Sequence, residues 1–145
     1  VKIFRTRVFL YIGLIALVGA IMLGTLLNRS VLEANVMADR NPLFVQLANG
    51  DIRNGFTLKV LNKLHEPRTF EIGLDGLAGG KLRIGDSDKP TMEVPTDVLS
   101  EARVFVTVPK AELAKLAKDT SPFNFVVRDT ASGTTTTRKA TFRRP

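Results

Sequence analysis

Two patterns of apolar residues divide this chain. Residues 8–27 form twenty consecutive positions without a charged side chain. At a helical rise of about 1.5 Å per residue, such a run covers about 30 Å, which is the thickness of the hydrocarbon core of a bilayer. The run therefore predicts a transmembrane helix, and with its flanks we assign it to a membrane segment over residues 1–30.

Basic residues flank the apolar run unequally. Lys2, Arg5 and Arg7 precede it, whereas Arg29 alone follows it before Glu33. Because segments rich in Lys and Arg stay on the cytoplasmic side of a membrane, we expect a cytoplasmic N-terminus and a translocated remainder of the chain.

A cleaved signal peptide is the alternative interpretation of the apolar run. The apolar core of a signal peptide is typically about 7–15 residues long, and residues 24–30 contain no small-residue pair suited to cleavage. We therefore favour a retained helix. Ala16, Ala20 and Gly24 stand four residues apart and share one helix face, which would let another membrane helix approach closely. Small residues are also common in membrane helices without such a contact, so both interpretations of this face stay open.

After residue 30 the apolar pattern changes to a period of two. Apolar and other residues alternate most clearly over residues 56–61, 69–74, 104–108 and 123–128. Such alternation is typical of half-buried antiparallel strands. Weaker strand candidates, separated like the others by turn-forming residues, are 32–37, 44–47, 81–84, 91–94 and 134–142.

The number of strand candidates indicates the fold. Seven to nine short strands in about 110 residues, without helices alternating between them, predict an all-β fold: an immunoglobulin-like antiparallel β-sandwich over residues 31–145, preceded by one transmembrane α-helix. Residues 109–118 interrupt the strands as a short predicted helix with Leu113 and Leu116 on one side. The Cys pair and Trp of antibody domains are absent, so the core has to consist of Phe, Val, Leu and Ile.

Composition narrows the classes of function. The net charge of +7 belongs to the two ends of the chain, because the segment between residues 7 and 138 carries 14 basic and 14 acidic residues. A DNA-binding face is larger and contiguous, so we expect no nucleic-acid partner. The cluster at the C-terminal end fits a solvated edge strand and tail, and it consists of Arg138, Lys139, Arg143 and Arg144.

The chain contains no cysteine. Disulfides, zinc–thiolate sites, iron–sulfur clusters and cysteine nucleophiles are therefore excluded from this sequence. The first residue is Val rather than Met, and we expect the sequence to be the C-terminal piece of a longer polypeptide.

Candidate metal ligands are sparse. His65 is the one histidine and precedes Glu66-Pro67 in an expected exposed loop, whereas zinc and copper sites need three or four protein ligands. Met37 and Met92 are soft enough to bind Cu(I), but nothing in the sequence places them near His65, and Met is ordinarily core filler.

The carboxylates do not form a recognisable catalytic or calcium-binding pattern. The candidates are Asp39, Asp51, Asp75, Asp86, Asp88 and Asp97. The segment 86–88 resembles the start of a calcium loop, but the required Gly and Glu do not follow it. We expect this segment to be non-catalytic, and we assign no catalytic, cofactor-binding or metal residue.

One constellation of residues is more distinctive. Asp39, Arg40, Asn41 and Pro42 precede a second polar segment, residues 49–54, which ends in Asn54. A structural interpretation is sufficient: Asp39 and Asn41 bond local backbone, Arg40 pairs with an acid, and Pro42 stiffens the turn. A partner-binding surface is the alternative, and we favour the structural role for Arg40.

Five features occur together in this sequence: the apolar run, the Asp-Arg-Asn-Pro-Leu segment at 39–43, the Asn-Gly-x-Ile-x-Asn segment at 49–54, the Thr-Leu-Lys strand and the Asn-Lys pair at 62–63. In this combination the sequence resembles the C-terminus of the FixG/CcoG family. The resemblance implies a bacterial inner-membrane protein with several spans, iron–sulfur clusters in a cytoplasmic module upstream of this sequence, and a terminal immunoglobulin-like domain in the periplasm. It also implies a role in Cu(II) reduction and in assembly of a haem–copper terminal oxidase.

Three hypotheses follow. The first is a membrane-anchored periplasmic module whose partners are the membrane, the other helices of its parent protein, and an oxidase subunit or copper carrier. The second is a stand-alone, single-pass adhesion or chaperone-like immunoglobulin domain. The third, which we favour least, is an enzyme that uses copper at His65 and the methionines.

Overall fold

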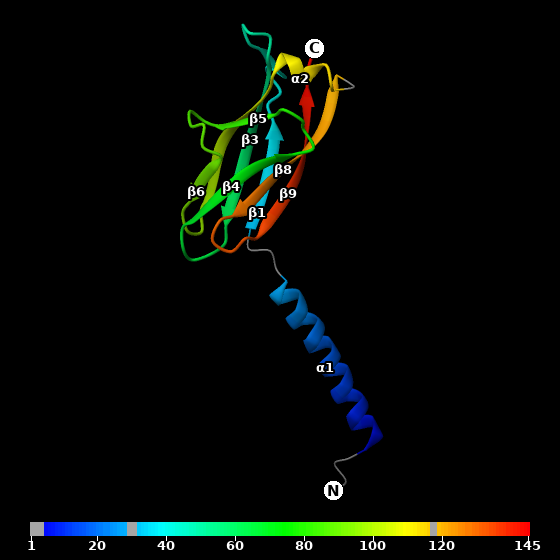
Figure 1. Ribbon diagram of the computed structural model, residues 1–145. Helices are drawn as coiled ribbons and strands as arrows, with labels where there is room; N and C mark the ends of the chain where they lie inside the picture. The colour runs from blue at the N-terminus through cyan, green and yellow to red at the C-terminus, as the bar shows by residue number, and fades with distance from the viewer. Residues whose placement is uncertain (1–4, 29–31, 117–118) are drawn as a thin grey trace. The chain divides into compact units, whose positions relative to one another are not determined.

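The computed structural model describes residues 5–28, 32–116 and 119–145. The chain forms two compact units, residues 1–30 and residues 31–145. The first contains one helix, and the second contains all strands (Figure 1).

The helix of the first unit is α1, Thr6–Leu27. It is long and apolar enough to cross a membrane, with a mean hydropathy of 2.4. Thr25 donates its hydroxyl to the carbonyl of Met22 at 2.8 Å, so the helix satisfies this polar group internally. Gly24 meets no neighbouring atom within 4 Å of where a Cβ would stand. The packing face of Ala16, Ala20 and Gly24 stays a prediction.

The second unit is a two-layer antiparallel sandwich, which confirms the predicted all-β, immunoglobulin-like fold. One sheet has the order β1-β3-β7-β5, with β2 also paired to β3, and the other has the order β6-β4-β8-β9. The strands are β1 (Leu32–Ala38), β2 (Val45–Gln46), β3 (Ile52–Asn62), β4 (Arg68–Asp75), β5 (Lys81–Ile84), β6 (Thr91–Val94), β7 (Leu99–Val108), β8 (Thr120–Asp129) and β9 (Thr135–Arg143).

The core lies between the inner faces of the two sheets. Three rings, those of Phe56, Phe123 and Phe125, contact one another with centroids 5.0–5.7 Å apart, and the two pairs that include Phe56 meet edge to face. Such aromatic pairs stabilise a core beyond the area they bury. They occupy the interior that a disulfide and a Trp fill in antibody domains.

Several predicted boundaries differ from the structure; β7, for example, begins at Leu99 rather than Val104. Two others differ for identifiable reasons. β3 begins at Ile52 rather than Phe56, because Asn54 is a buried polar residue that breaks the apolar alternation. The helix expected over 109–118 is only α2, Lys110–Leu113. The amides of Lys115 and Leu116 then bond three residues back, which tightens the turn. Leu113 and Leu116, which were expected on one side of this helix, both pack against the core. Residues 117 and 118 lie outside the described residues.

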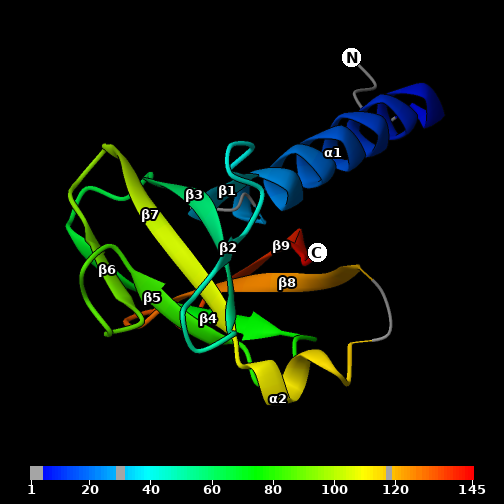
Figure 2. The same cartoon turned by 90° about the horizontal axis from the view of Figure 1, so that it is seen from above.

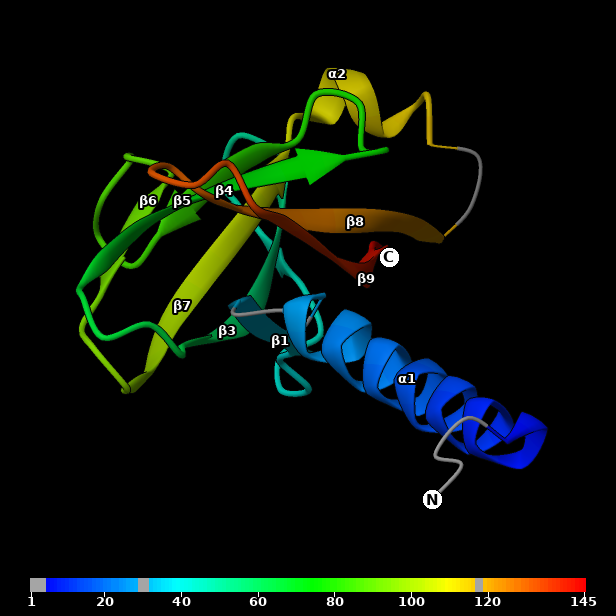
Figure 3. The same cartoon turned by 90° about the horizontal axis from the view of Figure 1, so that it is seen from below.

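The sandwich has two ends that we name by their position in Figure 1. The lower end is where β1 begins, and it carries the loops 63–67, 95–98 and 130–134. The upper end is where β1 finishes, and it carries the loop 39–44, α2 and the C-terminus. Figure 2 looks at the sandwich from the upper end and Figure 3 from the lower end.

Candidate interaction site

Asp39 lies at the upper end, immediately after β1, and it is held on both sides. Its backbone N–H donates to the carbonyl of Gly55 at 3.0 Å, and Arg103 donates to its carboxylate at 3.0 Å. A Cβ on Gly55 would stand 2.5 Å from Oδ2 of Asp39, so only glycine leaves room for this carboxylate. The prediction that the Asp39 side chain bonds nearby backbone is therefore wrong. Its partner is Arg103 on β7.

Asn54 connects the two sheets. Its side chain donates to the carbonyl of Arg143 at 2.7 Å and accepts from the N–H of Arg143 at 2.8 Å. Asn54 is 3 % exposed, and this pairing satisfies a buried amide with the backbone of the last strand. Asn54 is thus a clamp between β3 and β9, and this part of the motif is structural.

The residues between Asp39 and β2 are different, because they face solvent. Arg40, Asn41 and Pro42 are exposed, and the Asn41–Pro42 peptide is cis. Among the described residues, no ion pair to Arg40 is found, and the acid beside it, Asp39, is bonded by Arg103. The ion pair predicted for Arg40 is therefore absent from the described residues. Asp39 pairs with Arg103 instead, which no pattern in the sequence distinguishes.

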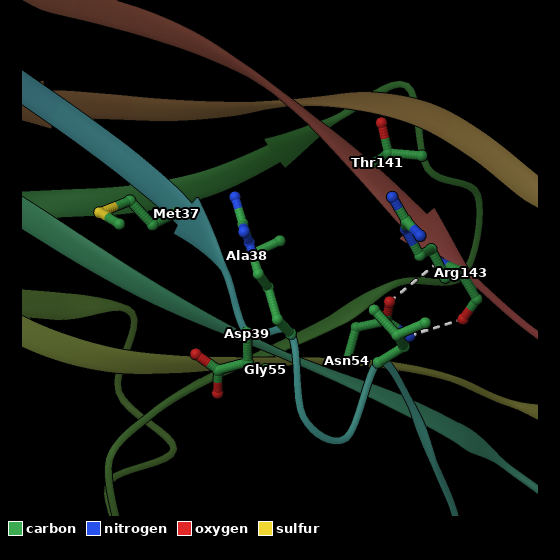
Figure 4. Close-up of a pocket in the computed structure, with 9 residues that line it drawn as sticks. Met37, Ala38, Asp39, Asn54, Gly55, Thr141 and Arg143 are labelled. Atoms are coloured by element: carbon green, nitrogen blue, oxygen red, sulfur yellow. Dashed lines mark hydrogen bonds between the residues drawn. The ribbon is translucent and has the colours of Figure 1, made fainter.

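These segments surround a pocket of about 330 Å³. Its walls come from the end of β1, the loop that follows, the start of β3 and the end of β9 (Figure 4). Basic, polar and apolar side chains all contribute, and they include Met37, Arg40, Leu43, Thr141 and Arg143. Asp39, Arg40 and Asn54 from the predicted motif line the same pocket, whereas Asn41 and Pro42 do not.

The outer face of the five-stranded sheet next to this pocket carries stacked cations. Arg53 lies over the ring of Phe105 at 5.0 Å from its centroid, and Arg103 lies at 5.8 Å. Gly55 is the register partner of Phe105, so no side chain on β3 displaces the ring. Cation–π contacts of this kind orient exposed guanidinium groups, and here they hold Arg103 where it reaches Asp39.

The lower end is built around two buried polar side chains. Asn62, at 1 % exposure, donates to the carbonyl of Glu66 at 2.8 Å and accepts from the N–H of Leu64 at 3.0 Å. Lys63 bonds Glu33 at 2.7 Å, and this hydrogen bond together with the lysine charge lowers the pKa of Glu33. The Asn-Lys pair of the motif therefore shapes the turn between β3 and β4.

Asp129 is the second buried polar group at this end. Burial raises its pKa, but hydrogen bonds from the N–H of Ala131 and the hydroxyl and N–H of Ser132, with the Arg68 charge, outweigh burial and lower the pKa. The hydrogen bond from the N–H of Ala131 and the one from the hydroxyl of Ser132 are each 2.9 Å long. Nε of Arg68 lies buried without a hydrogen-bond partner among the described side chains.

The candidate metal ligands lie apart. His65 is 93 % exposed at the lower end, as predicted, with Nδ1 3.2 Å from Asp97. Met37 is 54 % exposed near the upper end of β1, and Met92 packs against the core. Within the described ranges, no three His, Cys, Asp or Glu side chains are grouped as a metal site requires. These residues do not fit a copper site, and the chain has no cysteine for an iron–sulfur cluster.

The remaining carboxylates have structural contacts or lie in turns. Asp51 accepts from the N–H of Lys110 at 3.0 Å and thereby caps α2. Asp88 pairs with Arg83 at 3.2 Å, and Asp75 and Asp86 are exposed at strand and turn positions.

Three residues of the C-terminal basic cluster lie on an edge strand, β9, and Arg144 follows it in the tail, as predicted. Arg138 donates to the carbonyl of Ala34 on β1 at 2.6 Å, and Arg144 donates to the carbonyl of Leu113 at 2.9 Å. Lys139 and Arg143 are exposed.

Comparison with known proteins identifies the family. A family model described as "IG-like fold at C-terminal of FixG, putative oxidoreductase" matches residues 22–145. The chain is 36 % identical to the nitrogen fixation protein FixG of Rhizobium meliloti over 99 % of its own length and 28 % of that protein. It is also 36 % identical to protein RdxA of Cereibacter sphaeroides, over 75 % of this chain and 23 % of RdxA. The chain thus spans about a quarter of these curated relatives.

A solved structure shows the same fold. A FixG-related protein from Vibrio parahaemolyticus superposes with a TM-score of 0.67 at 19 % identity, covering 80 % of this chain and 98 % of that one. The resemblance noted in the sequence is confirmed, and the chain belongs to the family of FixG C-terminal immunoglobulin-like domains.

Proposed function

We propose that this chain is the membrane-anchored, non-catalytic end of a FixG-type protein. Its sandwich would lie on the periplasmic side of a bacterial inner membrane and dock a partner, while the parent's iron–sulfur clusters would lie upstream. The parent would serve Cu(II) reduction and assembly of a haem–copper terminal oxidase. The observation that carries the proposal is the match to FixG through almost the whole chain, helix included.

The sequence and the structure support a docking role rather than a reaction at this domain. The buried side chains of Asn62 and Asp129 at the lower end are engaged in turns, and the described residues offer no grouped metal ligands. Arg40, from the exposed part of the motif, in contrast lines a pocket at the upper end. A module that anchors its parent and presents a surface fits this arrangement.

Single cysteines test the orientation, because the chain has none of its own. Ala48→Cys places a thiol in an exposed loop of the sandwich, and Thr6→Cys places one at the start of α1. We expect a membrane-impermeant maleimide to label Ala48→Cys in spheroplasts, and to label Thr6→Cys only after lysis. The reverse labelling would overturn the orientation, and Ala48→Cys in a soluble fraction would indicate a cleaved signal peptide.

Removal of residues 31–145 from the parent tests the role in assembly. We expect the parent's iron–sulfur signals to persist in electron paramagnetic resonance spectra while the amount of haem–copper oxidase in the membrane falls. An unchanged oxidase level with the truncated parent would contradict the proposal.

A further inference from the structure

The neighbouring edges of the two sheets leave backbone groups open. Asp39 and Gly55 exchange a ladder bond between β1 and β3, so the alternate residues Val36 and Ala38 direct their N–H and C=O groups away from β3. On β9, the N–H and C=O of Arg143 bond Asn54 rather than β8. By the same alternation, Lys139 and Thr141 direct their backbone N–H and C=O groups away from β8.

We call the space between β1 and β9 the seam. These two strands run side by side in the same direction (Figure 1), and each is the edge of its own sheet. The Arg138 side chain bridges them at Ala34, and the Asn54 clamp reaches Arg143 at the upper end. Between these bridges, the described residues make no hydrogen bond to the edge-facing backbone of Ala38 or Thr141.

Two adjoining pockets open along the upper part of the seam. One is the pocket of about 330 Å³ described above, and the other has a volume of about 230 Å³. They share Ala38, Thr141 and Arg143 as lining residues. The space therefore continues along both strand edges, as a site for an extended segment requires.

The charge around the larger pocket is positive. Arg40 and Arg143 both line it and are exposed, and neither takes part in an ion pair among the residues that the structure describes. Asp39 is the one acid in the lining, and Arg103 neutralises it at 3.0 Å. Two guanidinium groups therefore face a space that contains no free carboxylate. Arginine binds carboxylates through paired, directional hydrogen bonds.

Apolar side chains complete the lining. Met37 is 54 % exposed and Leu43 is 44 % exposed, and both border the pocket. Met and Arg are enriched at protein interfaces. The combination of strand edges, apolar contacts and two guanidinium groups matches a peptide better than a lipid headgroup, which carries no backbone amides to pair with a strand edge.

We propose that the upper part of the seam binds an extended acidic segment of a partner protein. A carboxylate of this segment would lie between Arg40 and Arg143, and the backbone of the segment would lie against Ala38 or Thr141. The proposal rests on the docking role above and names the chemistry of the partner. Its test uses peptides alone, so its failure leaves the orientation and assembly experiments to decide the proposed function.

The test uses the 145-residue chain in phosphatidylcholine nanodiscs and three capped pentapeptides. The first is Thr-Val-Glu-Val-Thr, which favours an extended backbone and carries one carboxylate. The second has Gln for Glu, and the third has Pro for both Val residues, which removes backbone donors. Binding is followed by amide NMR shifts. We expect the Glu peptide to bind about tenfold more tightly than either other peptide, with shifts at Ala38, Arg40 and Thr141. The Gln peptide loses a charged hydrogen bond, which is worth about that factor, and the Pro peptide loses two backbone donors, which together are worth about the same.

Arginine variants localise the effect. Arg40→Gln and Arg143→Gln should each reduce binding of the Glu peptide about tenfold, and Arg143→Gln keeps the backbone that Asn54 clamps. Arg128→Gln is the matched control, because Arg128 is exposed on β8, near its lower end, and does not line the pocket. Unchanged amide dispersion shows that each variant is folded.

Several outcomes would overturn the proposal. Equal binding of all three peptides, or no binding, would exclude an extended acidic segment as the ligand of this site. An equal loss in Arg128→Gln indicates general charge attraction rather than a site. Shifts at these residues that require phosphatidylglycerol in the nanodisc, without a response to peptide, assign the surface to anionic lipid instead.

Discussion

The two ends of the sandwich use buried asparagine in the same way but leave different surfaces. At the lower end, Asn62 bonds backbone groups of the adjacent turn, only a few residues away, and it also donates to the carbonyls of Val94 and Pro95 at the end of β6. At the upper end, Asn54 bonds the backbone of a strand 89 residues away. The lower end is closed by its own loops. The upper end is held by one clamp that leaves Arg40 and the strand edges open, so the same chemistry makes a turn in one place and borders a site in the other.

The largest expected effect is at the lower end. Asn62→Ala removes the partner of the Leu64 amide and of the carbonyls that Asn62 contacts, and leaves these groups buried without hydrogen bonds. We expect a loss of about 3 kcal/mol in the free energy of unfolding. Urea titration followed by far-UV circular dichroism measures it, since the sandwich contains no Trp or Tyr to report by fluorescence. Asn35→Ala, at an exposed position of β1, is the control and should be near neutral.

Asn54→Ala tests the clamp at the upper end. It leaves the N–H and C=O of Arg143 without their partner, but the end of β9 can reach solvent more easily than the Asn62 turn. We expect a loss of about 2 kcal/mol, with faster amide exchange confined to β9 and the upper part of β1. Hydrogen exchange measured by mass spectrometry follows this, and protection equal to that of the unaltered chain would show that the clamp does not hold the seam.

Asp129 gives the lower end a dependence on pH. Its pKa is lowered in the folded chain, so the ionised form is stabilised by folding. This stability is complete above the unfolded pKa of about 3.9 and is lost as the pH falls through the folded pKa. Asp129→Asn should cost about 1 kcal/mol at neutral pH and weaken the loss of stability in acid. Urea midpoints at pH 7 and pH 3 measure both effects, and parallel pH profiles of the two chains would contradict this assignment.

The smallest expected effect is at Arg40. Because its side chain is exposed and without an ion pair among the described residues, Arg40→Ala should change the free energy of unfolding by less than about 0.5 kcal/mol. The same urea titration measures it. A loss comparable to that of Asn54→Ala would make Arg40 structural, which is the role favoured from the sequence, and would remove the contrast within the motif.

The alternation of apolar residues was sufficient to predict the sandwich and its last strand, β9, and helical spacing placed Leu113 and Leu116 on one side of their segment. It failed where a buried position is polar: Asn54 and Asn62 face inward on β3, and no pattern of hydrophobicity distinguishes them from exposed residues. Asp39, Arg40 and Asn54 stand in one recognisable motif of the sequence, but nothing in that motif indicates which residues contact them. Arg103, Thr141 and Arg143 join them only because β7 and β9 return to the same end, which depends on topology rather than on spacing along the chain.

The Asn54 clamp also has a consequence in time. Asn54 is synthesised 89 residues before Arg143, which is the last residue of the last strand. Contacts between residues so far apart form late, because the intervening chain must be ordered first. During synthesis, a chain that has not reached residue 143 therefore carries an unpaired amide near the start of β3, and the sandwich becomes fully stable only once its final strand has emerged.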